Sequence, residues 1–350
     1  MKKIPAALLC SFLLLTALAS CSEQGSAQGT TPPSPPASAS PTISSPSPSP
    51  EVTDGLSVAF LKGPTGMGAA YFMEQSENGK LDDDYDILLE ADPTVVTSGL
   101  ISGELDIAAV PTNVACTLYN KTNGNVKLAA INTMGVLYIL EKGDTISSAG
   151  DLFDKTVYAT GQGSNPEYVL NYILSKYDLI PGENITVEYL PSDELAARMA
   201  SGELEVCMLP VPAATSVLLK NKDVREALNL TDEWSAVSGD GSILTQGCIV
   251  YRSDKVSEAQ MSSFLEDYSE SIEYMTDTAN LDAAAELTVK HEIVASDTVA
   301  KAALPKCGIT FITGADEMRE NLAGYFRVLF AADPKSIGGS VPDDAFYREG

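Results

Sequence analysis

Two glycine-rich loops have the clearest potential for chemistry, and each joins an apolar run to a helix-like segment. The first comprises residues 63–68 and the second residues 161–166. Glycine lets backbone N–H groups approach a ligand closely, and the start of a helix adds the positive end of its dipole. Thr65 and Ser164, which lie 99 residues apart, occupy equivalent places, and each can donate a hydroxyl hydrogen bond. These features are typical of loops that bind a small polar molecule.

Further polar residues stand where predicted strands end. In open α/β sheets, ligands bind beyond the carboxyl ends of the strands, so these residues extend the predicted ligand-binding set. For any single loop, the alternative is that its residues only form turns and cap helices. That alternative is weaker for the whole set, because the predicted topology makes the loops converge. The candidate ligand-binding residues are Gly63, Thr65, Gly66, Met67, Thr112, Asn113, Asn132, Thr133, Gln162, Gly163, Ser164, Asn165, Val211 and Gln246.

Residues suited to catalysis or metal binding are sparse. The chain has one histidine, His291, and no C-x-x-C, G-x-S-x-G or Walker A motif. Residues 161–166 lack the third glycine of a dinucleotide fingerprint. We therefore expect no catalytic residue, no cofactor and no metal site. His291 is interpreted as a surface or hydrogen-bonded histidine within a helical segment, residues 282–294. The acidic residues 82–84 are interpreted as a solvated loop, because regular calcium-ligand spacing is missing.

An internal repeat predicts the elements that position these loops. Residues 102–115 (SGELDIAAVPTNVA) align with residues 201–214 (SGELEVCMLPVPAA), and six of the fourteen positions are identical. At the same offset, both glycine-rich loops follow a short apolar strand and precede a helix. The repeat predicts two similar lobes, each built strand–helix–strand–helix–strand. Because strands alternate with helices, we expect an α/β fold with parallel strands covered by helices.

Two apolar, β-branched segments outside the repeat predict how the lobes are joined. Residues 126–140 and 245–253 lie on either side of the second repeat and are interpreted as crossover strands. This places residues 54–140 and 246–350 in lobe 1, and residues 141–245 in lobe 2. The mostly helical tail after residue 257 is expected to pack back on lobe 1.

Local signals within the lobes predict helix starts and buried residues. Asp92 before Pro93, and Asn165 before Pro166, are expected to cap helices. Trp234 is assigned either to the core or to the rim of the cleft between the lobes. Four cysteines, Cys116, Cys207, Cys248 and Cys307, are interpreted as small buried residues, although a disulfide between two of them stays open.

The N-terminus has the pattern of an export signal. Lys2 and Lys3 precede an apolar run, and the run ends at Leu18-Ala19-Ser20-Cys21, which resembles a bacterial lipobox. We expect residues 1–20 to be a signal peptide and Cys21 to be lipidated. A plain secreted protein cut nearby is the alternative. Residues 21–53 are rich in Pro and Ser and are predicted to be a disordered tether.

The charge balance limits the possible partners. With 22 Lys and Arg against 48 Asp and Glu, the chain carries a formal net charge of −26. Such a surface repels phosphate backbones, so we expect no nucleic-acid partner.

Taken together, these features resemble the substrate-binding lipoproteins of bacterial ABC importers with the type II periplasmic-binding-protein fold. Residues 135–174 and 102–115 carry most of the resemblance, which extends over about residues 55–335. Within that group the chain looks most like proteins that bind aliphatic sulfonates, nitrate or thiamine precursors.

The resemblance implies a function at the outer surface of the cell. A monomer, held by its lipid on the extracytoplasmic face of the cell membrane, would capture a small polar solute between its lobes. The solute would be a sulfonate or a thiamine-precursor-like heterocycle, and its receivers would be an ABC permease and its ATPase. The alternatives are a two-lobed enzyme of precursor biosynthesis and a surface lipoprotein with a signalling or adhesive role.

Overall fold

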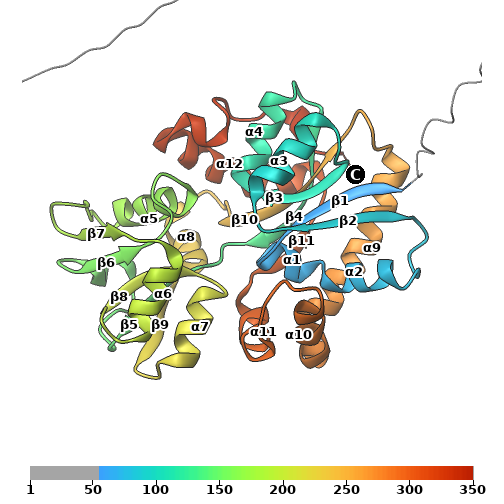
Figure 1. The fold of residues 1–350 in the computed structure, drawn as a ribbon. Helices are drawn as coiled ribbons and strands as arrows, with labels where there is room; N and C mark the ends of the chain where they lie inside the picture. Colours follow the sequence, from blue (N-terminus) through green and yellow to red (C-terminus); the bar gives the residue numbers. More distant parts are fainter. Residues whose placement is uncertain (1–54, 350) are drawn as a thin grey trace, which may run out of the picture. The chain divides into compact units, whose positions relative to one another are not determined.

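The computed structural model describes residues 55–349 (Figure 1). The predicted signal peptide, the lipidated Cys21 and the tether of residues 21–53 lie outside the described residues. In the described part, no helix is long and apolar enough to cross a membrane.

The first sheet is mixed and has the strand order β11-β4-β10-β3-β1-β2. Strand β1 pairs in parallel with β2 and β3, whereas β10 runs antiparallel to both β3 and β4. Strand β11 pairs antiparallel with β4 at the edge. The strands are β1 (Leu56–Leu61), β2 (Tyr85–Glu90), β3 (Ile107–Pro111), β4 (Val126–Met134), β10 (Thr245–Arg252) and β11 (Ile309–Ile312).

The second sheet has the order β7-β6-β8-β5-β9. Strand β6 pairs in parallel with β7 and β8, and β5 runs antiparallel to β8 and β9. Two sheets of this kind confirm the predicted two-lobed α/β fold class. The strands are β5 (Leu137–Lys142), β6 (Thr156–Ala159), β7 (Thr186–Tyr189), β8 (Val206–Pro210) and β9 (Val224–Asn229).

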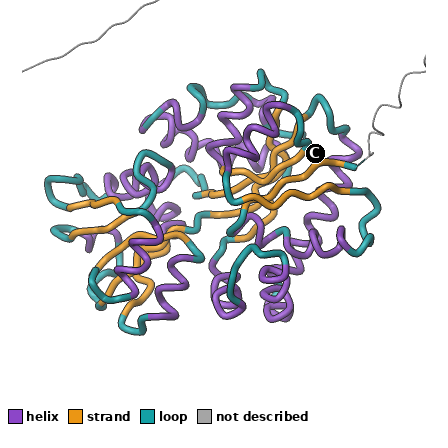
Figure 2. The backbone as a smooth tube through the Cα atoms, in the orientation of Figure 1, coloured by secondary structure: helices purple, strands orange, loops and turns teal. Residues whose placement is uncertain are grey.

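Helices flank the strands of both sheets (Figure 2). The helices between the strands of the first sheet are α1 (Pro64–Gly68), α2 (Ala70–Glu77), α3 (Pro93–Ser102) and α4 (Thr112–Lys121). The second lobe contains η1 (Ala149–Leu152), α5 (Asn165–Lys176), α6 (Ser192–Ala200), α7 (Ala213–Lys220) and α8 (Leu230–Ser238). The tail contains α9 (Glu258–Thr276), η2 (Thr278–Asn280), α10 (Leu281–Lys290), α11 (Asp297–Ala303), η3 (Leu304–Lys306), α12 (Ala315–Ala332), η4 (Pro334–Ile337) and η5 (Asp344–Phe346).

Helix α3 begins and ends as its sequence predicts. The Asp92 carboxylate accepts a hydrogen bond of 2.8 Å from the backbone N–H of Thr94, and Pro93 is the first helical residue. Gly103 ends the helix with a φ of 81°, a conformation that glycine adopts without strain. The predicted cap is therefore confirmed.

The first crossover differs from the sequence prediction. Residues 126–140 were expected to form one crossover strand within lobe 1, but the segment divides at Gly135 and its second half, β5, pairs in the second sheet. A Cβ atom on Gly135 would lie 2.5 Å from Thr231 Oγ1 and 2.8 Å from the Leu244 side chain. Strands buried on both faces are continuously apolar, so periodicity does not show where one ends.

The tail packs on the first sheet, as expected. The Ser271 hydroxyl of α9 accepts from the backbone N–H of Phe72 at 2.9 Å and donates to the Gly68 carbonyl at 2.8 Å. The rings of Phe60 and Tyr268 stack with centroids 5.8 Å apart. These contacts fix α9 against α1 and α2, beside the first glycine-rich loop.

Helix α12 packs on both lobes, which the sequence did not predict. Its Tyr325 hydroxyl donates to Asn165 Oδ1 of α5 at 3.0 Å, and its ring lies 6.1 Å from that of Trp234. Trp234 has no exposed surface and is therefore a core residue rather than a cleft-rim residue. One apolar cluster includes Val110 of the first sheet, Leu137 of the second sheet and Tyr325. The tail thus braces the two lobes.

The second lobe contains a buried carboxylate, Glu141, which is 3% exposed. Its oxygens accept hydrogen bonds from the N–H and hydroxyl of Thr145, at 2.9 and 2.6 Å, and from the N–H of Ile146 at 3.2 Å. Arg225 donates a further bond at 2.6 Å. Burial raises the pKa of Glu141, but these hydrogen bonds together outweigh it and hold the pKa below the ordinary value of 4.5.

We predict that Glu141→Gln lowers the free energy of unfolding by about 2 kcal/mol at pH 7, because an amide cannot accept all of these bonds. A lowered folded-state pKa contributes stability that is complete above the unfolded value of 4.5 and is lost as the pH falls through the folded value. The difference from the parent should therefore narrow below about pH 4.5. Urea unfolding at several pH values measures this difference in the free energy of unfolding, with the exposed Glu188→Gln as control. A difference that does not change with pH would contradict this account.

Candidate functional site

Four segments of lobe 1 meet where its strands end. They are the α1 turn, the start of α4, the end of β4 and the start of β10. The closeness is clearest at Gly247, where an added Cβ would lie 2.5 Å from Thr65 Cγ2 and 2.9 Å from Asn132 Oδ1. The predicted convergence of these loops is therefore present within this lobe.

A buried hydrogen-bond network holds the four segments together. The hydroxyls of Thr112 and Thr245 lie 3.0 Å apart, and Thr245 also donates to the Thr133 carbonyl at 3.1 Å. The Asn132 amide donates to the Tyr268 hydroxyl at 2.9 Å and its oxygen accepts from Thr133 Oγ1 at 3.1 Å. The side chains of Thr112, Asn132 and Thr133 are buried, so contact with a ligand would require this network to open.

Three other members of the predicted ligand set are also enclosed. Thr65 is 8% exposed and donates its hydroxyl to the Leu61 carbonyl at 3.1 Å. Met67 has no exposed surface, and its sulfur lies 3.5 Å from the Cys307 sulfur. Val211 is 2% exposed. In this conformation these side chains are packed beneath the loops and are not available to a ligand.

Gly66 has a packing role as well. An added Cβ there would lie 2.6 Å from the Leu61 carbonyl oxygen. The absence of a side chain therefore lets the α1 turn fold tightly against the end of β1.

The glycine-rich loop of lobe 2 is more open. Gln162, Gly163 and Ser164 are exposed. The Ser164 hydroxyl donates to the Gly161 carbonyl at 2.7 Å, and Ser164, not Asn165, occupies the N-cap position of α5. Asn165 is the first helical residue and is only 7% exposed, because its oxygen accepts from Tyr325. The sequence Ser-Asn-Pro is compatible with a helix cap at Ser164 or at Asn165. The Asn165 side chain is engaged by Tyr325 of α12, so the cap position falls to Ser164.

The half-buried members of the set lie in lobe 1. Gly63, with a φ of 105°, begins the α1 turn, and Gln246 lies beside Gly247 in β10. Asn113 lies in the first turn of α4 and donates to the Ser336 carbonyl at 3.2 Å. With the exposed loop of lobe 2, these three residues are the members of the set that solvent reaches.

The tail contributes neighbours that the sequence did not identify. Besides Ser336 beside Asn113, Asp333 accepts a hydrogen bond of 3.3 Å from the Tyr168 hydroxyl of α5. The same Tyr168 hydroxyl lies 3.1 Å from the Gly163 carbonyl. No motif marks Asp333 or Ser336, because the pairs they form are separated by 165 and 223 residues.

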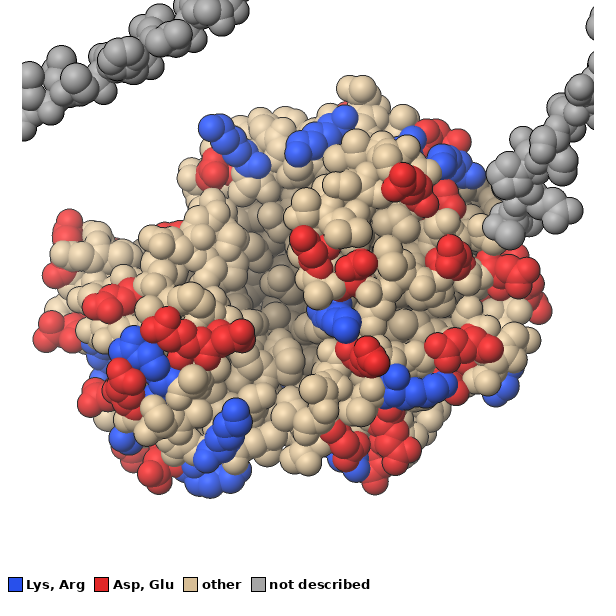
Figure 3. Space-filling model, in the orientation of Figure 1, with Lys and Arg blue, Asp and Glu red and all other residues tan. Residues whose placement is uncertain are grey.

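A hollow separates the two lobes on the face shown in Figure 3. Charged side chains lie on its rim, while its floor is formed largely by residues other than Lys, Arg, Asp and Glu (Figure 3). The floor of the hollow therefore presents few charged side chains on this face.

The four cysteines among the described residues are poorly suited to act as nucleophiles. Cys116, Cys207, Cys248 and Cys307 are all free and buried, which answers the open question of a disulfide among them. Burial raises the pKa of the Cys116, Cys207 and Cys307 thiols to about 12. A protonated, enclosed thiol is a poor nucleophile, so these residues pack the core.

Solved structures of solute-binding proteins share this fold. An ABC transporter protein from Parabacteroides distasonis is 23% identical, with a TM-score of 0.71, and the match covers 85% of this chain and 99% of that one. The periplasmic aliphatic sulphonate binding protein SsuA from Escherichia coli is 16% identical, with a TM-score of 0.64 and coverage of 85% and 94%. The periplasmic nitrate-binding protein NrtA from Synechocystis is 14% identical, with a TM-score of 0.51 and coverage of 82% and 84%.

Two comparisons with known proteins found no match. No protein-family model matches the chain, and no curated protein matches it. The similarity therefore establishes the fold.

The site contains buried residues that support the loops and exposed residues that do not. Substitutions in the two groups should therefore differ in their effect on the free energy of unfolding. We predict that Asn132→Ala lowers the free energy of unfolding by about 1–3 kcal/mol, because Tyr268 and Thr133 lose a buried partner. Gln162→Ala, at an exposed position, should stay within about 0.5 kcal/mol of the parent. Urea unfolding of the two variants makes the comparison. Equal losses would contradict the division into supporting and exposed residues.

Proposed function

We propose that the chain is the extracytoplasmic solute-binding component of an ABC importer and that it captures a small polar organic solute between its lobes. The observation that carries the proposal is the pair of sheets whose strand-end loops present uncharged polar groups from both lobes. Gln162 and Ser164 would contact the solute from lobe 2, and Asn113 and Gln246 from lobe 1. Thr65, Thr112, Asn132 and Thr133 would position those loops.

The polarity of the loops favours a neutral or amine-bearing heterocycle over a sulfonate. An anion would be held best by free backbone N–H groups at the start of α5. There, however, the Glu167 carboxylate already accepts the Gly163 N–H. Lys62, directly before the first glycine-rich loop, is the one cation at the predicted strand-end loops, and the net charge of −26 favours approach by a cation. A thiamine-type pyrimidine has the donors and acceptors that Asn and Gln side chains would match.

Capture would involve closure of the lobes. A ligand that contacts both lobes stabilises the conformation in which both contacts are made, by the difference in its affinity for the two states. The two crossover points, next to Gly135 and Leu244, are joined by a hydrogen bond of 2.7 Å and provide a compact hinge. The bound protein would then dock as a monomer on a permease that is driven by an ATPase.

A ligand screen tests the proposal. The full chain is mixed with alkanesulfonates, nitrate, thiamine precursors, amino acids and nucleobases, and its thermal unfolding is measured. A true ligand at a hundredfold excess over its Kd should add about 2.7 kcal/mol of stability. We expect a heterocycle or amine to raise the Tm. A shift with alkanesulfonates alone would overturn the ligand class but not the binding function.

Variants and scattering then locate the site of the ligand that is found. Gln162→Ala, Asn113→Ala and Ser164→Ala should each weaken binding by about 0.5–1.5 kcal/mol, because each removes a hydrogen bond. Ser269→Ala on α9 is the matched control and should bind as the parent does. Small-angle scattering should show compaction on saturation. Unchanged affinity in all three loop variants, together with an unchanged radius of gyration, would contradict capture between the lobes.

The proposed membrane anchor has a separate test. Cys21→Ala should move the protein from the membrane fraction to the soluble fraction of its host, because the acceptor of the lipid is removed. Cys10→Ala, within the predicted signal peptide, should leave the protein in the membrane fraction. Fractionation with immunoblotting measures both variants. Full retention of the Cys21→Ala protein in the membrane would show that the anchor lies elsewhere.

A further inference from the structure

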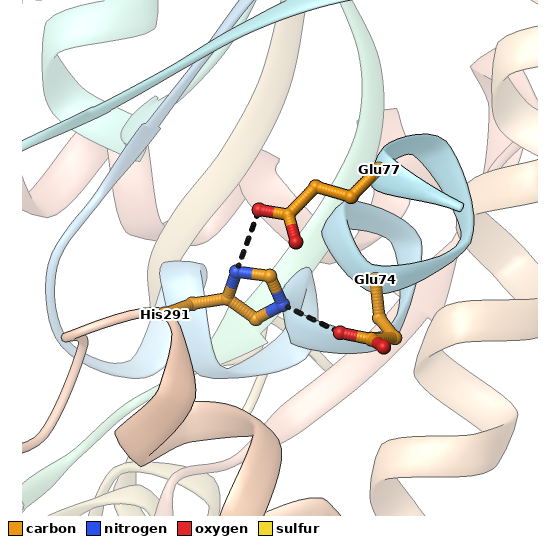
Figure 4. Close-up of side chains that lie close together, drawn as sticks. All are labelled: Glu74, Glu77 and His291. Atoms are coloured by element: carbon orange, nitrogen blue, oxygen red, sulfur yellow. Dashed lines mark ion pairs between the residues drawn. The ribbon is translucent and has the colours of Figure 1, made fainter. Parts of the chain in front are cut away.

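A cluster of Glu74, Glu77 and His291 lies on lobe 1, outside the loops proposed to bind the solute (Figure 4). Glu74 and Glu77 are three residues apart on α2, so they share one face of the helix. His291 directly follows α10. The fold therefore brings together side chains that are more than 200 residues apart in sequence, including the only histidine of the chain.

His291 is buried in an unusual way. Its side chain is 6% exposed, and its Nε2 has no hydrogen-bond partner among the described residues. Nε2 lies 3.4 Å from Glu74 Oε2, and Nδ1 lies 3.5 Å from Glu77 Oε1. A buried ring nitrogen without a partner costs about 1–3 kcal/mol, so its place between two carboxylates calls for an explanation.

We propose that Glu74, Glu77 and His291 bind a divalent transition-metal ion of the zinc class. One ring nitrogen of His291 and one oxygen of each carboxylate lie within 4.8 Å of one another. The unpartnered Nε2 is the proposed nitrogen ligand, and Glu77, which now lies beside Nδ1, would turn toward the ion. Tetrahedral coordination at about 2.0–2.2 Å needs ligand atoms about 3.3 Å apart. The Nε2–Glu74 distance already meets this requirement, and Glu77, at 57% exposed, is free to rotate.

The donor chemistry selects the metal. One imidazole and two carboxylates form a mixed nitrogen and oxygen set, which suits Zn²⁺ better than Ca²⁺ or Mg²⁺. Three protein ligands leave a fourth position for water. A hollow of about 520 Å³, lined by Ser76, Tyr85 and Glu292 among others, adjoins the cluster and gives solvent access to it.

Lys290 is the competing cation. Its ammonium group contacts Glu74 Oε2 and lies 3.1 Å from Glu77 Oε2. Because the Lys290 side chain is 50% exposed, it can turn to solvent when a metal ion takes its place. A divalent ion neutralises both carboxylates completely, whereas the single positive charge of Lys290 neutralises them only in part. Removing Lys290 should therefore strengthen metal binding, which an ordinary ion-pair cluster would not do.

Metal binding would also restrain the first glycine-rich loop. Ile293, two residues after His291, lies 3.4 Å from the position that a Cβ on Gly66 would occupy. A metal that links α2 to the end of α10 therefore fixes the segment against which the α1 turn packs. The site would act as a structural brace of lobe 1, and its test is independent of any solute.

The experiment uses the full chain, purified with a tag that contains no histidine. Zinc chloride is titrated calorimetrically, and thermal unfolding is compared in zinc and in EDTA. Because His291 is the only histidine, a long-range ¹H–¹⁵N spectrum of the imidazole reports ligation directly. We expect a higher Tm in zinc and a changed ¹⁵N shift of one ring nitrogen.

Variants separate the metal site from an ion-pair cluster. His291→Ala should weaken zinc binding by at least about 100-fold, since loss of a direct ligand exceeds the loss expected for its neighbours. Glu77→Gln, at a largely exposed position that folding does not require, should weaken it at least about tenfold. Lys290→Ala should bind zinc as tightly as the parent or more tightly, and the exposed Glu273→Gln should match the parent. Equal zinc affinity in the parent, His291→Ala and Glu77→Gln would overturn the proposal, as would an unchanged imidazole spectrum.

Discussion

Strands β4 and β10 pair antiparallel beside each other, and this pairing sets where the chain crosses between the lobes. The pair extends from Val126 opposite Arg252 to Met134 opposite Thr245, in the interior of the first sheet. The chain leaves lobe 1 at the end of one strand and returns at the start of the other, so both crossings lie side by side. Gly135 permits this approach, because a side chain there would collide with Thr231 and Leu244. The two lobes are therefore joined at adjacent points, and α12 and an apolar cluster shared by both sheets brace this connection.

The same pairing explains why so many polar residues at the strand ends are not exposed. Thr133 is the last residue but one of β4 and Thr245 is the first residue of β10, and their hydrogen bonds extend to Thr112 and Asn132. A buried network whose members are all paired is rigid, and rigidity preorganises the loops above it. The polar side chains that stay exposed, such as those of Gln162 and Ser164, lie outside this network. Under the proposed function, the buried residues would support the exposed side chains that contact the solute.

The C-terminal tail packs on both lobes and links them. Helix α9 fills the face of the first sheet with stacked aromatic rings, and α12 reaches across to Trp234 and Asn165 of the second lobe. At the end of α10, the tail also places Lys290 and His291 against the acidic face of α2. In a chain with a net charge of −26, local compensation of this kind limits repulsion between neighbouring carboxylates.

The alternation of strands and helices, the repeat behind the two lobes and local features such as the cap at Asp92 can all be predicted from the amino-acid sequence. These depend on periodicity, turn residues and hydrogen bonds between residues close in the chain, which a sequence displays directly. Packing between distant segments determines that β5 belongs to the second sheet, that Asn165 binds Tyr325 instead of capping α5, and that Trp234 is enclosed. It also determines that His291 lies between Glu74 and Glu77. Each of these outcomes depends on a partner between about 70 and more than 200 residues away, and no local pattern encodes the identity of such a partner.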